Sequence, residues 1–126
     1  MKRHICAVSG SRADYGLLRW MLKEIHDDSG LELHLVVTGS HLLAEYGSSI
    51  DEIEADRIPI CGRIDVIDPT DSAQGIARAI GAGVLRFSET FSQLELDVLL
   101  LLGDRYEIFA AAVAATALHI PIAHCH

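Results

Sequence analysis

The sequence predicts an α/β domain with three layers, in which a parallel sheet of strand order 3-2-1-4-5 is covered by helices on both faces. Short apolar segments alternate five times with longer segments of helical character. Right-handed crossovers turn such an alternation into a parallel sheet between helical layers. A length of 126 residues, 50% of them hydrophobic, fits one domain with a useful core.

The first half of the chain predicts two strands and two helices. Residues 4–8 form a strand, and Asp14 is the expected N-cap of the helix that follows. Residues 31–37 form the second strand, and an acidic helical stretch, residues 49–56, resumes after a break at Gly47. Five apolar residues of the first helix recur at helical spacing and are expected in the core: Leu17, Leu18, Met21, Leu22 and Ile25.

The second half predicts three strands and two helices. Residues 58–64 form an edge strand, because Pro59 and Gly62 disfavour a central position. Asp71 should cap a long helix to about residue 95, with residues 97–102 as a strand buried on both faces. Three glycines should loosen that helix: Gly75, Gly81 and Gly83. An alanine-rich helix (residues 108–118) and a last apolar run (residues 120–126) complete the pattern.

Composition excludes several classes of protein. Eighteen acidic and ten basic residues give a formal charge of -8, which argues against a general nucleic-acid or anionic-membrane surface. The three cysteines lack CxxC spacing, so neither a disulfide framework nor a zinc knuckle is expected. No signal peptide or membrane span is evident, and we expect a cytoplasmic domain.

Three loops follow the first, second and fourth strands, where an open α/β sheet presents its ligand crevice. In the predicted order the first and fourth strands flank the switch point, so their loops should face each other. Arg12 and Arg105 could each grip a phosphate there, aided by helix N-termini. Neither the Walker A spacing nor GxGxxG is present. The loops are Ser9–Tyr15, Thr38–His41 and Gly103–Arg105.

Structural alternatives exist for these residues. Asp104 and Glu107 have the spacing of a capping box, and Arg105 could simply pair with Glu107. His124 and His126 share one face of a strand, but no third ligand is placed by spacing, so no metal is expected. His41 is expected to bond a polar ligand. The remaining histidines are expected to be ordinary surface or strand-end residues: His4, His26, His34 and His119.

Four separated motifs together resemble the hydrolysing branch of the UDP-N-acetylglucosamine 2-epimerases. They occur in the family's order along the whole chain. Arg12-Ala13-Asp14-Tyr15 favours the hydrolysing branch, because the other branch has Arg-Pro-Glu in this loop. The motifs span residues 9–18, residues 39–42 with Tyr46 and Gly47, residues 103–107 and residues 120–124.

The resemblance implies a Rossmann-like domain, the first part of the N-terminal domain of a GT-B fold. Residues 1–126 would be that incomplete domain, and the C-terminal nucleotide-binding domain would be absent. The sheet would end at a bare edge, so we expect the chain to be the front part of a longer protein. Family members commonly dimerise through this domain, so a homodimer is expected.

The implied reaction releases UDP from the UDP-sugar by elimination and then adds water with inversion at C2, using no cofactor. The free sugar would be N-acetylmannosamine or a related precursor of sialic-acid-like sugars. Asp104 would be a catalytic acid or base, and His126, where some relatives carry glutamate, could share that role. The residues implied to bind substrate are Ser11, Arg12, Tyr15, His41, Arg105 and His124.

Two other functions fit the same pattern. A different GT-B enzyme would transfer the sugar to an acceptor, whereas an epimerase releases it free. A non-catalytic binding or assembly module would keep the fold and tolerate Asp104→Asn. The isolated chain is expected to be inactive, because half of the implied cleft would be missing.

Overall fold

The computed structural model describes residues 1–43, 48–66 and 72–125. Five parallel strands form one sheet in the order β3-β2-β1-β4-β5, which confirms the predicted topology. The strands are β1 (Arg3–Ser9), β2 (Leu31–Thr38), β3 (Ile60–Ile64), β4 (Val98–Leu102) and β5 (Ile122–Cys125). The helices are α1 (Arg12–Asp27), α2 (Ser48–Ala55), α3 (Ala73–Gln93) and α4 (Tyr106–Ala117), with a 3₁₀ turn η1 (Gly39–Leu42) after β2.

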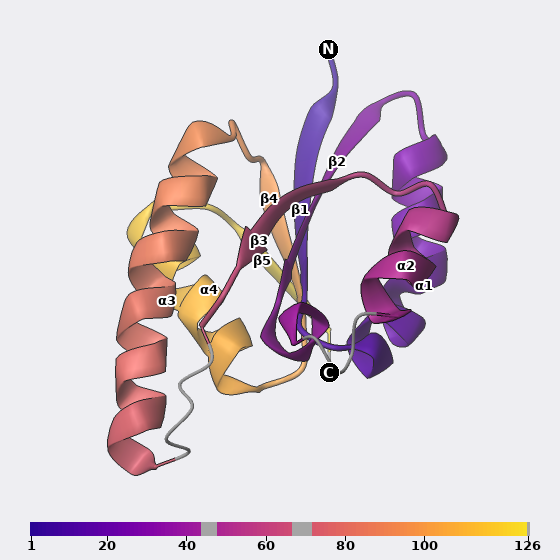
Figure 1. The fold of residues 1–126 in the computed structure, drawn as a ribbon. Helices are drawn as coiled ribbons and strands as arrows, with labels where there is room; N and C mark the ends of the chain where they lie inside the picture. The colour runs from indigo at the N-terminus through magenta and orange to yellow at the C-terminus, as the bar shows by residue number, and fades with distance from the viewer. Residues whose placement is uncertain (44–47, 67–71, 126) are drawn as a thin grey trace.

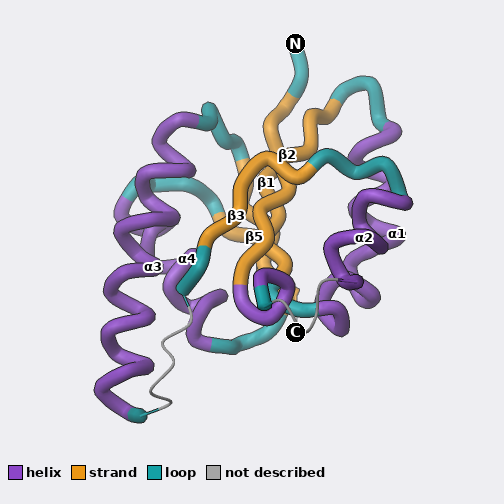
Figure 2. Tube along the Cα trace, viewed as in Figure 1, coloured by secondary structure: helices purple, strands orange, loops and turns teal. Residues whose placement is uncertain are grey.

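Helices cover both faces of the sheet. Helices α1 and α2 lie on one face, and α3 and α4 lie on the other, so the molecule has three layers (Figures 1 and 2). This arrangement follows from the strand order, because the chain moves outward from β1 to β3 and then returns to β4 on the other side. Among the described residues, every helix lacks the combination of length and apolar character that a bilayer crossing requires.

The core has two halves, one on each face of the sheet. In β4, Leu99 and Leu101 face α3 and α4, whereas Leu100 and Leu102 face α1 and α2. This alternation is the two-residue period of a strand buried on both sides. The burial on both faces predicted for residues 97–102 is therefore confirmed, as is the edge position of the third strand, although β3 begins at Ile60, after Pro59.

Helix α1 begins earlier than expected, and its apolar stripe is only partly core. Ser11, not Asp14, is the N-cap: its backbone is extended and its Oγ accepts a hydrogen bond from the Asp14 amide at 3.2 Å. Leu18 and Leu22 are buried, but Leu17 and Met21 are exposed. A helix turns about 100° per residue, so Leu17 and Met21 share a different face from Leu18 and Leu22.

Helix α3 is continuous through its glycines rather than loosened by them. A Cβ on Gly83 would lie 3.0 Å from Ala110 Cβ and 3.0 Å from Val66 Cγ1, so the glycine lets α3 pack closely against α4. Ser72 caps the helix, with its Oγ accepting from the Gly75 amide at 2.9 Å. The predicted cap, Asp71, lies outside the described residues, as does the predicted break at Gly47.

Candidate active site at the carboxyl edge of the sheet

The strands end together at the edge of the sheet that η1 and the end of β5 occupy, at the bottom of Figure 1. Gly103 follows β4 with a φ of 85°, and its N–H donates to the Cys125 carbonyl of β5 at 2.9 Å. His124 Nε2 lies 2.7 Å from the Gly103 carbonyl oxygen, with which it hydrogen-bonds. The loop after β4 is therefore joined to β5, a contact that the sequence analysis did not predict.

Asp104 lies in this loop with an exposed side chain. The capping-box alternative is wrong, because the N-cap of α4 is Arg105 rather than Asp104, and the Arg105 side chain makes no capping hydrogen bond. Asp104 and His124 both line a cavity of about 260 Å³ between β5 and α4. A larger hollow of about 520 Å³ at the amino end of β3 contains none of the predicted site residues. The smaller cavity thus holds a carboxyl group and an imidazole that can move a proton.

Arg105 is held by Glu107, which confirms the alternative that the two side chains pair. Arg105 Nε donates to Glu107 Oε1 at 2.8 Å, and this hydrogen bond raises the pKa of the Arg105 guanidinium. The Arg105 side chain is still 64% exposed, whereas that of Glu107 is 2% exposed. A guanidinium has five N–H donors, so Arg105 keeps donors for an anion while Glu107 fixes its orientation.

Glu107 lies beneath the loops after β1 and β2. A Cβ on Gly10 would be 3.1 Å from Glu107 Oε1, and a Cβ on Gly39 would be 3.0 Å from the same oxygen. The other oxygen, Glu107 Oε2, is buried without a hydrogen-bond partner among the described residues. Sequence reasoning missed this packing role and considered Glu107 only as a capping or pairing residue.

Short hydrogen bonds connect the loop after β1 to η1. Ser40 N donates to the Gly10 carbonyl at 2.9 Å. His41 is buried, with Nε2 2.8 Å from Ser9 Oγ and Nδ1 2.8 Å from Ser49 Oγ of α2. Burial lowers the pKa of His41, which favours the neutral ring, in which one nitrogen donates to one serine hydroxyl and the other accepts from the second. Both ring nitrogens are engaged within the chain, so this geometry favours a structural role over contact with a ligand.

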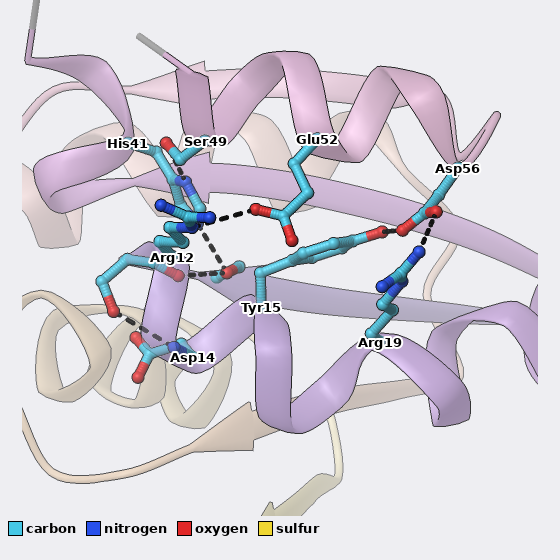
Figure 3. Close-up of polar contacts among 10 residues, drawn as sticks. Arg12, Asp14, Tyr15, Arg19, His41, Ser49, Glu52 and Asp56 are labelled. Atoms are coloured by element: carbon cyan, nitrogen blue, oxygen red, sulfur yellow. Dashed lines mark hydrogen bonds and ion pairs between the residues drawn. The ribbon is translucent and has the colours of Figure 1, made fainter. Parts of the chain in front are cut away.

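Arg12 and Ser11 lie at the start of α1, beside this loop. Arg12 is exposed, and its Nε donates to Glu52 Oε2 of α2 at 3.1 Å (Figure 3). Surface ion pairs of this kind contribute roughly 0–1 kcal/mol, so a ligand phosphate could displace Glu52 at small cost. Ser11 Oγ accepts from the Asp14 amide as the N-cap, and the Ser11 carbonyl accepts from the Tyr15 amide at 3.0 Å, so Ser11 has a structural role at the start of α1 and keeps its hydroxyl proton as a donor.

Tyr15 points away from this edge. Its side chain runs beneath α2, and its hydroxyl donates to Asp56 Oδ2 at 2.6 Å (Figure 3). Asp56 also accepts from Arg19 at 2.7 Å and pairs with Lys23 at 3.4 Å. The Arg19 hydrogen bond, reinforced by Tyr15 and Lys23, holds the pKa of Asp56 at about 2. This network joins α1 to the end of α2 and favours a structural role for Tyr15.

The structure places four of the predicted residues near the carboxyl edge of the sheet. Three lie in the loop after β4 and in β5, and the fourth begins α1, where it pairs with Glu52. Glu52 and Asp56 were missed, because their partners are about forty positions away and no spacing rule links them. His126, Tyr46 and Gly47 lie outside the described residues. The four residues are Arg12, Asp104, Arg105 and His124.

Comparisons with known proteins show the family of the chain. The family model described as UDP-N-acetylglucosamine 2-epimerase matches residues 23–126. The chain is 48% identical to a Legionella pneumophila protein named UDP-N,N'-diacetylbacillosamine 2-epimerase (hydrolyzing), covering all of this chain and 33% of that one. It is 36% identical to a Campylobacter jejuni protein named GDP/UDP-N,N'-diacetylbacillosamine 2-epimerase (hydrolyzing), covering 98% of this chain and 32% of that one.

A crystal structure of UDP-GlcNAc 2-epimerase from Neisseria meningitidis bound to UDP-GlcNAc superposes with a TM-score of 0.79 at 18% identity. It matches 96% of this chain and 31% of that one. The chain thus spans about a third of the length of the curated relatives it matches, and its sheet is that of the N-terminal domain of these GT-B enzymes. With a family model matching over most of its length and relatives agreeing along all of it, the chain belongs to the UDP-N-acetylglucosamine 2-epimerase family.

Proposed function

We propose that this chain is the N-terminal portion of a hydrolysing UDP-sugar 2-epimerase. The observation that carries the proposal is the placement of Asp104 and His124 on one cavity, beside an arginine that Glu107 holds at the start of α4. Elimination of UDP needs a group that moves a proton and cationic donors that stabilise the leaving diphosphate. Both kinds of group lie at the carboxyl edge of adjacent strands, where open α/β sheets bind ligands.

The reaction proceeds in two steps. A base removes the C2 proton while the C1–O bond to the diphosphate breaks, giving UDP and a 2-acetamidoglucal. Water then adds its oxygen to C1, and C2 receives a proton on the opposite face, releasing the free epimerised sugar. Asp104 transfers protons in these steps, and Arg12 and Arg105 stabilise the diphosphate. The assignment of His126 as a second catalytic group stays a prediction from sequence.

The relatives favour one substrate. The Legionella pneumophila protein, at 48% identity, is named for UDP-N,N'-diacetylbacillosamine, whereas the superposed structure bound to UDP-GlcNAc is 18% identical. We therefore assign UDP-N,N'-diacetylbacillosamine as the preferred substrate and UDP-N-acetylglucosamine as the poorer one. The product would enter the synthesis of sialic-acid-like sugars in the cytoplasm.

The test is Asp104→Asn in the full-length protein, with UDP and free sugar measured for both UDP-sugars. We expect a loss of about 10²-fold or more in kcat, typical of removing a proton-transfer group. Asp27→Asn, an exposed carboxylate at the far end of α1, is the matched control and should keep wild-type activity. Unchanged turnover by Asp104→Asn, or transfer of the sugar to an acceptor without release, would overturn the proposal.

The protein is also proposed to act as a homodimer. Three large apolar residues of α1 are exposed, namely Leu17, Trp20 and Met21. Exposed clusters of this kind are typical of association surfaces. Light scattering on the full-length protein should give the mass of two chains, and Trp20→Glu should shift it toward one if α1 lies in the interface.

A further inference from the structure

A cluster of two imidazoles and one carboxylate lies at the opposite end of the sheet from the candidate active site. His4 of β1 is paired in register with Glu32 of β2, and His34 of β2 pairs with Cys6. Because side chains alternate along strands, His4, Glu32 and His34 all point to the face that α3 and α4 cover. Parallel pairing thus brings His4 close to Glu32 and His34, which lie 28 and 30 positions later in the sequence.

The ligand atoms of the three side chains are close enough to share one ion. One ring nitrogen from each histidine and one carboxylate oxygen of Glu32 all lie within 4.8 Å of one another. His4 Nδ1 is 3.0 Å from His34 Nε2 and 3.5 Å from Glu32 Oε2. Tetrahedral zinc holds N and O ligands at about 2.0–2.1 Å, which places them about 3.4 Å apart. These two separations lie on either side of this value and the third is no more than 4.8 Å, so rotations of the exposed side chains would bring all three ligands into range.

The cluster is accessible to solvent, and hydrogen bonds to Asp97 anchor the backbone of His4. The His4 and Glu32 side chains are 31% and 47% exposed, so an ion can reach them from solvent. On the other side of β1, His4 N donates to Asp97 Oδ2 at 2.7 Å, and Asp97 N donates to the His4 carbonyl at 2.9 Å. These bonds fix the His4 backbone before β4 begins, so the ring approaches β2 from a defined position.

We propose that His4, Glu32 and His34 form a binding site for a divalent transition metal ion, with Zn²⁺ as the ion that fits best. Two neutral imidazoles and a carboxylate are a common zinc donor set, and they disfavour Ca²⁺ and Mg²⁺, which prefer oxygen. Three protein ligands leave a fourth position for water. His4 precedes the end of β1 by five residues, about 16 Å along a strand, so the ion would lie away from the carboxyl edge.

The bound ion would tie β1 to β2 at their amino ends. It would stabilise the folded protein in proportion to the logarithm of its free concentration over its Kd, because the unfolded chain does not bring the ligands together. The site is independent of the UDP-sugar reaction. Without an ion, the same two rings are joined by an N–H···N hydrogen bond, which is the competing explanation for their contact.

The test is calorimetric titration of the full-length, EDTA-treated and desalted protein with ZnCl₂, alongside thermal unfolding with and without Zn²⁺. Wild-type protein should bind one Zn²⁺ with a Kd at least about tenfold lower than His34→Gln or Glu32→Gln, and its Tm should rise with Zn²⁺. His26→Gln removes an exposed histidine of α1 and is the matched control, with wild-type binding expected.

Glu32→Gln keeps the test decisive if a histidine variant does not fold, because Glu32 is at the surface and its metal-free unfolding should match wild type. Equal zinc affinity in wild type and Glu32→Gln would overturn the proposal, as would a Zn²⁺-induced Tm shift of the same size in both. Absence of zinc binding by the folded wild-type protein would leave the hydrogen bond as the whole explanation.

Discussion

Gly39 begins η1 with a φ of 60°, in the region that side chains rarely adopt. A Cβ there would also lie 2.4 Å from the Gly10 carbonyl oxygen. Gly103 has a similar φ of 85°, but a Cβ on it would meet nothing within 4 Å. Substituting each glycine by alanine therefore separates two contributions to the free energy of unfolding, the strain of the backbone conformation and the steric clash of a Cβ.

We expect Gly39→Ala to destabilise the fold by more than about 2 kcal/mol, since conformational strain and a backbone clash add. Gly103→Ala should lose about 1 kcal/mol, from conformation alone. Urea unfolding of both variants, followed by Trp20 fluorescence, measures the difference. Equal losses would show that the loop after β1 moves aside easily and that its contact with η1 is not rigid.

Asp56 gives the fold a predictable dependence on pH. Its pKa is lowered from 3.8 to about 2, chiefly by the Arg19 hydrogen bond. The ionised carboxylate therefore stabilises the fold above about pH 4, and this contribution is lost as the pH falls toward 2. A shift of this size corresponds to about 2 kcal/mol.

Asp56→Asn should thus lower the free energy of unfolding at pH 6 by about 2 kcal/mol, and the difference from wild type should shrink toward pH 2. Tyr15→Phe should show a smaller loss of the same sign, about 1 kcal/mol, because it removes one hydrogen bond. Urea unfolding between pH 2 and 6 provides both values. A difference that stays constant with pH would contradict the role assigned to the Asp56 carboxylate.

At the scale of elements, the packing of α3 on α4 depends on small residues. Four of the six buried residues of α4 are alanines, namely Ala110, Ala111, Ala114 and Ala115, and Gly83 of α3 lies against Ala110. Helices approach closely where such residues meet, because backbone atoms rather than side chains limit their separation. The alanine content of residues 108–118 predicted a helix, but the helix against which it packs was not identifiable from sequence.

Gly83→Val should destabilise the protein by about 1–3 kcal/mol, through overpacking against Ala110 and Val66. Gly81→Ala is the matched control in the same helix, because a Cβ there would meet nothing within 4 Å. That variant should be stabilised by about 0.5–1 kcal/mol through helix propensity. Thermal unfolding compares them, and a stabilised Gly83→Val would show that the helices separate without cost.

At the scale of the whole molecule, the chain spans about a third of its curated relatives. The residues proposed to act on the UDP-sugar lie on an open surface at its carboxyl edge, with Arg12 73% exposed and Arg105 64% exposed. An open site leaves the diphosphate in water, where charges are screened and elimination is little assisted.

We therefore expect the 126-residue chain alone to show no UDP release above background from either UDP-sugar, and the full-length protein to turn over. A coupled assay for UDP, at equal molar concentrations of the two proteins, makes the comparison. Circular dichroism of the short chain is the control that it is folded. Turnover by the folded short chain would show that its own residues complete the site.

The sequence by itself determined the fold class, the strand order and the family, because apolar periodicity and loop motifs depend only on residues that are neighbours in the chain. It also placed Asp104 and Arg105 at the carboxyl edge of the sheet, since they follow the fourth strand and parallel strands bring their carboxyl ends together. The ends of helices were less predictable, because several nearby polar side chains can compete to cap them. In α1 the N-cap is Ser11 rather than Asp14.

The tertiary structure decided which polar side chains have partners and which remain available. Tyr15 and His41 lie in motifs at the site, yet their polar atoms bond to Asp56, Ser9 and Ser49. Such pairings join residues 8 to 41 positions apart, and they depend on how α1, η1 and α2 pack rather than on spacing in the chain. Burial removes a side chain from solvent and from ligands alike, and burial is a property of the assembled fold.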